Sequence, residues 1–211
     1  RIPTARLTLN GAPVQAGATV DLSVPGYRYE LNWDVQGLPV APLANSFSPS
    51  YRGQAQGVLF SSTKIKGAGV TGRTLREHLN GEAQLVFTNA NIQLVGPKAK
   101  AILTPIALVL GAPELLNSPL DFVNATVRAG GGQIQIAEFL AHSPAFVARS
   151  QGVIPIADVL SDSPLNQEIE VSIARGLATK LRFANVPTNA AYVTLPSFAR
   201  LRGTLGSPDV K

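Results

Sequence analysis

The chain has 211 residues, with 18 Lys and Arg against 13 Asp and Glu, a net charge of +5, and no Cys or Met. Without cysteine there is no disulfide framework, thiolate nucleophile, zinc knuckle or iron–sulfur site, and two His cannot supply a His-rich metal centre. Hydrophobic residues make up 45% of the chain and charged residues only 15%, against roughly 25% in an average domain.

The distribution of charged and apolar residues further limits the classes of protein to which the chain can belong. Lys and Arg are dispersed and do not alternate with aromatic residues, so we expect no nucleic-acid partner. The longest apolar window, residues 101–116, is broken by Pro and Gly and is shorter than the roughly 20 residues that span a bilayer. The length predicts a single domain, residues 1–211, with a possible division into 1–55 and 56–211. The chain begins at Arg1, with no initiator Met and no signal-peptide pattern, so we expect an excised or processed segment of a longer protein.

The first third of the chain has the pattern of short strands separated by turns. Tyr29, Leu31 and Trp33 alternate with polar residues over 27–35, the period of two that is typical of a half-buried strand. Three prolines among Asn and Ser predict a loop over 39–52. Shorter strands, expected to pair as meanders, are predicted over 6–9, 19–24 and 57–65.

The pattern changes at Thr74. Thr74 and Glu77 fit a capping box, and Asn80-Gly81 ends the predicted helix within two turns. Pro97 stands where a first helical residue belongs and begins a longer amphipathic helix predicted to reach Leu116. Between the two helices, strands are predicted over 82–87 and 91–95, joined by a turn at 88–90.

The remainder is predicted to be β-structure. Good alternation occurs at Ile134 and Ile136 and again at Ile169, Val171 and Ile173. Glycine and Ser-Pro turns separate strands predicted over 120–128, 133–139, 145–148, 168–174, 177–183 and 192–195. The fold class expected from these elements is mainly β: a curved, largely antiparallel sheet with one short and one longer helix packed on it.

No motif for catalysis or cofactor binding withstands physical scrutiny. Gly67, Gly69 and Gly72 spell GxGxxG, but the following helix is too short for a crossover, and no acidic residue stands where a ribose would be bound. His78 and His142 have no accompanying nucleophile or metal-binding motif. We therefore expect no catalytic residue, no metal and no cofactor.

Several motifs together resemble the AsmA-like family of bacterial envelope proteins, to which TamB belongs. The block 60–96 is similar to the family's central strand, glycine turn, short helix and hairpin, with Leu79-Asn80-Gly81 at its L-x-G. Gly132-Gln133-Ile134 and the run 152–156 resemble family strand starts. The end of the chain, 201–210, is similar to the family's C-terminal G-T-L-x-x-P-x-V motif. One departure lies in the block 60–96, where Asn89-Ala90-Asn91 stands in place of the usual Asp-Gly turn of the hairpin.

The resemblance implies a function. Members are similar to bridge-like lipid transfer proteins, with an inner-membrane anchor and a long bent sheet that reaches through the periplasm and carries phospholipid on an apolar concave side. The chain would then be a periplasmic segment, without the anchor, involved in phospholipid transport between the two membranes and in outer-membrane integrity. The family has no catalytic residue to transfer to this sequence, so we expect a non-enzymatic protein.

A groove for acyl chains needs a continuous apolar lining without buried ions. The residues expected to line it are Tyr29, Leu31, Trp33, Leu85, Phe87, Ile134, Ile136, Ile169, Val171 and Ile173. Two alternatives remain open at this point. The chain could be a structural or chaperone-like envelope module that binds outer-membrane proteins through its sheet edges, or a closed sandwich that binds nothing inside.

Overall fold

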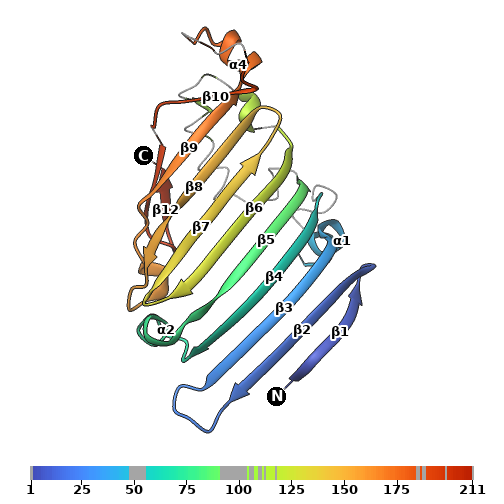
Figure 1. Cartoon of the computed structure of the whole chain (residues 1–211), viewed down its shortest axis with the longest axis vertical. Coiled ribbons are helices and arrows are strands. Elements are labelled where there is room, and N and C mark those ends of the chain that lie inside the picture. Colours follow the sequence, from blue (N-terminus) through green and yellow to red (C-terminus); the bar gives the residue numbers. More distant parts are fainter. Residues whose placement is uncertain are drawn as a thin grey trace.

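One large antiparallel sheet forms the computed structural model of the chain (Figure 1). The structure describes residues 2–47, 56–90, 104, 107–108, 111, 113–116, 118–183, 186, 189–197 and 199–210. The sheet has 12 strands in the order β1-β2-β3-β4-β5-β6-β7-β8-β9-β11-β12, and β10 also pairs with β9. Strands β1 and β12 stand at opposite ends of this order, so the sheet is open. The predicted fold class, mainly β with a largely antiparallel sheet, is confirmed.

Each strand from β1 to β9 pairs with its neighbours in sequence, which is the connectivity of a meander. The strands are β1 (Ile2–Leu9), β2 (Ala12–Asp21), β3 (Arg28–Pro39), β4 (Val58–Ala68), β5 (Asn80–Ala90), β6 (Leu120–Gly130), β7 (Gln133–His142), β8 (Phe146–Pro155), β9 (Gln167–Ala174), β10 (Tyr192–Thr194), β11 (Ala199–Gly203) and β12 (Pro208–Val210). The helices are α1 (Val40–Phe47), α2 (Gly72–His78) and α4 (Arg175–Lys180), with 3-10 turns η3 (Pro113–Leu116) and η4 (Leu160–Asp162).

The turn between β2 and β3 is longer than the sequence predicted. The predicted strand 19–24 ends at Asp21, because the Asp21 carboxylate accepts hydrogen bonds from the Ser23 amide (2.9 Å) and hydroxyl (2.6 Å) and closes a local turn. Gly26 and Tyr27 both adopt positive φ, at 84° and 40°, so Tyr27 lies in the turn and β3 begins at Arg28. The alternation from Tyr29 onward is confirmed as a strand.

The predicted loop 39–52 contains a helix. Helix α1 begins at Val40 and holds Pro42 in its first turn, where a missing backbone N–H removes no helical hydrogen bond. Leu43 of α1 packs on a small core formed by Val35 and Leu38 with Ala12. The sequence prediction treats the three prolines as loop residues, although a proline such as Pro42 is compatible with the first turn of a helix. Residues 48–52 lie outside the described residues.

Helix α2 is confirmed, but its cap lies three residues earlier than expected. Thr71 is the N-cap: its hydroxyl accepts from the Thr74 amide at 3.3 Å, and the Thr74 hydroxyl accepts from the Thr71 amide at 3.1 Å. The reciprocal pair is thus Thr71 and Thr74 rather than Thr74 and Glu77.

Strand β5 runs without a break through the predicted turn at 88–90. Asn89 takes a φ of 52° inside the strand, a conformation that asparagine adopts more readily than most residues, so the turn prediction was wrong. The predicted strand 91–95 and most of the predicted helix 97–116 lie outside the described residues. Among the described residues of that stretch, Thr104, Ala107 and Leu108 are helical, and η3 follows at Pro113–Leu116.

The predicted strand 177–183 is also wrong, since α4 occupies its first half. Leu177 and Leu181 are four residues apart, as in a helix, and pack with Ala178 against the larger core. Over so short a run, helical and strand periods are hard to distinguish. Strand β8, in contrast, extends seven residues beyond the predicted 145–148, to Pro155.

Candidate functional site: the apolar face of the sheet

The strand registers align alternate residues into rows that cross the sheet. Directly paired residues in antiparallel strands point to the same face. We define the apolar face by four such rows. They are Leu7, Val14, Val35, Ser61, Leu85, Ala125, Phe139, Ser150, Ile169 and Ala199; Ala16, Trp33, Thr63, Ala83, Val127, Ile136 and Gly152; Ala18, Leu31, Ile65, Gly81, Ala129, Ile134 and Ile154; and Leu38, Leu59, Phe87, Val123, Ala141, Ala148 and Val171. None of these residues is charged.

The alternate rows form a polar face. One of them runs through Asn32, Lys64, Glu82, Arg128 and Gln135. Cross-strand ion pairs lie on this face: Arg128 to Glu82 at 3.7 Å, and a second pair between Arg149 and Glu170 at 3.4 Å. Charge is thus segregated to one side of the sheet.

The ten residues expected from the sequence to share a lining all lie on the apolar face. Nine belong to the four rows or to the adjacent row, in which Tyr29 pairs with Val20 and Gly67. Ile173 pairs with Phe146 and Val193, two residues along β9 from Val171. Residues predicted from alternation alone thus share one side of the sheet, on strands as far apart as β3 and β9.

The C-terminal part of the apolar face is covered by the protein itself. Val171 is 4% exposed and Ile173 0% exposed, within a core that includes Phe146 and Leu195. Side chains that pack against this core from outside the long strands are Leu116, Leu177, Leu181, Phe183, Val186 and Val193. Val171 and Ile173 are therefore core residues, and Ile169 and Phe87 are partly buried against the same cluster. The part of the lining expected on β9 is occupied by contacts within the chain.

The face is open along the rows of Leu31 and Trp33, whereas the row of Leu38 is covered by the two cores, as at Leu38 itself, which is 5% exposed. Trp33 and Leu85 are 37% and 39% exposed, and Leu31, Ile134 and Ile136 are partly exposed. Exposed apolar side chains that lie side by side on a face mark binding surfaces in proteins. This open region, from β1 to β7, is the candidate site.

Polar groups on the open region are few and concealed. The Trp33 indole Nε1 donates a hydrogen bond of 3.2 Å to the Ser61 hydroxyl on the neighbouring strand. The Thr63 hydroxyl is buried and has no hydrogen-bond partner among the described residues. The surface therefore offers little polar anchorage to a guest molecule.

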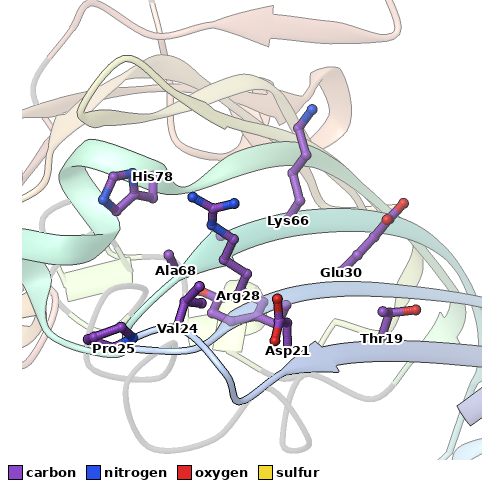
Figure 2. A pocket seen from close by; sticks show the side chains of 11 residues that line it. Thr19, Asp21, Val24, Pro25, Arg28, Glu30, Lys66, Ala68 and His78 are labelled. Carbon is purple, nitrogen blue, oxygen red and sulfur yellow. The ribbon is translucent and has the colours of Figure 1, made fainter. Parts of the chain in front are cut away.

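Clefts with a clear outline lie on the polar face. One, of about 740 Å³, lies between β2, β3 and β4, and Figure 2 shows Arg28 and Lys66 extending into it with His78 nearby. A second, of about 700 Å³, includes Lys64, Glu82 and Arg128. Sequence reasoning missed these clefts because their charged residues come from different strands and form no local motif.

Two pKa shifts belong to this end of the molecule. The hydrogen bonds from Ser23 lower the pKa of the Asp21 carboxyl. Burial raises the pKa of the Tyr29 hydroxyl, which lies on the apolar side of the same strands. The Asp21 charge is thus already satisfied by its own turn.

A polar network elsewhere deserves comparison with a catalytic site. His142 Nδ1 lies 2.9 Å from the Asp121 carboxylate, and Nε2 lies 3.2 Å from the Tyr192 hydroxyl. Tyr192 donates its hydrogen to the Ser143 carbonyl at 2.8 Å, so it is not a free nucleophile. The ring of Phe122 stacks on His142 at 5.1 Å. We interpret this arrangement as a link between strand ends.

The fold and the segregated faces define the class: an open, two-faced antiparallel β-sheet protein. Comparison with protein-family models, curated proteins and solved structures finds no match for the chain. Across the described residues, no helix combines the length and apolarity needed to span a membrane. Those same residues contain no group of three or more metal-ligating side chains.

Proposed function

We propose that the chain is a lipid-carrying segment of an AsmA-like protein of the bacterial envelope. It holds phospholipid acyl chains on its apolar face and lets them move along it, without catalysis or a cofactor. The observation that carries the proposal is that four rows of residues cross the sheet with no charged side chain, while charges occupy the opposite face.

The energetics favour a hydrocarbon guest. Each buried CH₂ contributes about 0.8 kcal/mol, and a buried unpaired charge costs several times as much. Because the Trp33 indole is already bonded to Ser61, few polar groups on the face hold a chain in one place. A guest is retained by area alone and can slide.

The dimensions are compatible with an acyl chain. The row through Leu31 crosses six strands in the open region, from Ala18 of β2 to Ile134 of β7. At about 4.8 Å per strand this row spans roughly 24 Å, against roughly 15 Å for one leaflet of a bilayer's hydrocarbon core. A tail fits within the open region from β1 to β7.

The resemblance to the AsmA-like family supplies the cellular setting of the proposal. On this proposal the chain works in the periplasm, in a protein anchored to the inner membrane, and moves phospholipid towards the outer membrane. The C-terminal motif on which the resemblance rests corresponds to β11 and β12, which pair as a hairpin.

The test compares adjacent residues on opposite faces of β3. We expect Leu31→Asp to reduce the phospholipid that co-purifies with the chain by about tenfold or more, because it places a charge in the apolar row. Asn32→Asp, one residue along on the polar face, should retain wild-type lipid. Native mass spectrometry and organic extraction measure the bound lipid. Equal lipid in a folded Leu31→Asp variant and in the wild type would refute the proposal.

A structural or chaperone-like role is the second candidate, and the open edges favour it. Among the described strands β1 pairs only with β2 and β12 only with β11, which leaves backbone groups available to an added strand. Capture of extended outer-membrane-protein peptides by a lipid-free chain, lost when β1 is blocked by Arg6→Pro, would support this function over lipid transport.

A further inference from the structure

Exposed apolar side chains gather on the connections at one end of the sheet, the end that carries α2 in Figure 1. Leu22 and Tyr27 lie in the β2–β3 turn and Val70 in the β4–α2 connection, and Leu22 and Val70 are each 73% exposed. Val159, 56% exposed, and Leu160 lie in the β8–β9 connection. We name these five residues the apolar tip.

Hydrogen bonds and packing hold the three connections together. The Gly69 amide donates to the Gly26 carbonyl at 2.5 Å and to the Tyr27 carbonyl at 3.1 Å, which joins the first two turns. Arg76 of α2 forms an ion pair with Asp158, which joins α2 to the β8–β9 connection. A Cβ at Gly72 would collide with the Ala157 carbonyl, so that junction is close. The tip is therefore a fixed feature of the fold.

Charged side chains of both signs lie beside the tip, and two of them are cations that can bind phosphate. The Asp21 carboxylate is satisfied by Ser23 and that of Asp158 by Arg76. Arg28 and Lys66 line the cleft of Figure 2 together with Asp21 and Glu30, and, after the hydrogen bonds from Ser23, the charge of Arg28 contributes to the lowered pKa of Asp21. The cleft beside the tip thus offers two cations to a lipid phosphate, next to two carboxylates that are their cross-strand neighbours.

The tip is continuous with the apolar face. Asp21 and Arg28 form the last pair of β2 and β3, and the next pair inward, Val20 with Tyr29, already belongs to the apolar side. Val20 is 44% exposed. A hydrocarbon chain that leaves a bilayer at the tip can therefore reach the apolar face along an uncharged path.

We propose that the apolar tip docks on a phospholipid bilayer, with Leu22, Tyr27 and Val70 inserted among the lipids and Arg28 and Lys66 at the phosphates. Protruding aliphatic and aromatic residues flanked by cations have the composition of interfacial membrane anchors. This inference deepens the proposed function, on which it rests, because it names the bilayer as the source or destination of the lipid.

The test is co-flotation of the purified chain with vesicles of phosphatidylcholine, with and without phosphatidylglycerol. We expect Leu22→Asp with Val70→Asp to weaken vesicle binding by about tenfold or more, because both charges would enter hydrocarbon. Phe60→Asp with Val153→Asp, two exposed apolar residues of the polar face outside the tip, is the matched control and should bind as the wild type does. Arg28→Gln with Lys66→Gln should weaken binding several-fold and only where phosphatidylglycerol is present.

Further outcomes show whether a bilayer or a second copy of the chain occupies the apolar tip. Leu22→Ser with Val70→Ser should also weaken binding, and circular dichroism shows whether each variant is folded. The inference is overturned if the wild type does not float with vesicles, or if the tip variants float as it does. It is equally overturned if the wild type self-associates without vesicles and Leu22→Asp with Val70→Asp makes it monomeric, since a second copy would then occupy the tip. Leu31→Asp should still bind vesicles, so a failure of lipid carriage is distinguishable from a failure of docking.

Discussion

Thr63 occupies the middle of the apolar face, and its hydroxyl has no hydrogen-bond partner among the residues that the structure describes, although Thr63 is only 2% exposed. An unsatisfied buried hydroxyl costs free energy, so Thr63→Val should raise the free energy of unfolding by about 1 kcal/mol. Ser61→Ala is the matched change with the opposite expected sign, because the Ser61 hydroxyl accepts from Trp33. Urea denaturation of both variants checks the prediction, and a loss of stability in Thr63→Val would contradict it.

Gly81 shows how closely neighbouring strands approach at the residue scale. It adopts a φ of 156° and pairs with Ile65, and a Cβ there would collide with the Lys64 carbonyl oxygen. Gly81→Ala should therefore lower the free energy of unfolding by roughly 2 to 4 kcal/mol.

Gly176→Ala is the control for that substitution. Gly176 lies in α4 with open space around it, so alanine should be neutral or stabilise by up to about 1 kcal/mol through its helix propensity. Similar denaturation midpoints for the two variants would show that the backbone at Gly81 can move aside.

At the scale of elements, Tyr192 joins β10 to the end of β7 through its contacts with His142 and the Ser143 carbonyl. Tyr192→Phe should lower the free energy of unfolding by about 1 kcal/mol at neutral pH, since the buried carbonyl loses its donor. Tyr27→Phe, in the exposed β2–β3 turn, is the control and should have little effect.

The stability difference between the wild type and Tyr192→Phe should depend on pH. Burial, and secondarily the charge of Asp121, raise the pKa of Tyr192 in the folded protein. As pH rises past about 10, Tyr192 ionises in the unfolded chain before it ionises in the folded protein, so the wild type loses stability there. The Tyr192→Phe variant has no hydroxyl to ionise at this position and does not lose that stability. The stability gap between the two should therefore narrow above pH 10 in urea titrations. A gap that is constant or widens with pH would contradict this prediction.

Elements were predictable from sequence where local pattern and tertiary environment agree. Strands such as β3 and β7 alternate apolar and polar residues, and this period of two is visible in the sequence itself. Helices α1 and α4 were missed, because each is short and takes its stability from packing of Leu43 or Leu177 on a core built by distant strands. Propensity alone does not reveal such contacts.

At the scale of the whole molecule, the sequence located the apolar face but not the extent of its cover. Ile134 and Ile173 have similar alternating surroundings in sequence, yet Ile134 is partly exposed and Ile173 is fully buried. The difference arises from segments after β9 that pack on the sheet. The apolar tip was equally hidden, because it unites three connections that lie far apart along the chain.

The order of strands from β1 to β9 has a consequence for how such a protein changes in size. Since every one of these strands pairs with its immediate neighbours in sequence, duplication or loss of a two-stranded hairpin leaves all remaining pairings and their sidedness intact. Each added hairpin would widen the sheet by about 10 Å. The reach of such a scaffold is thus adjustable in modular steps, by genetic duplication or by design.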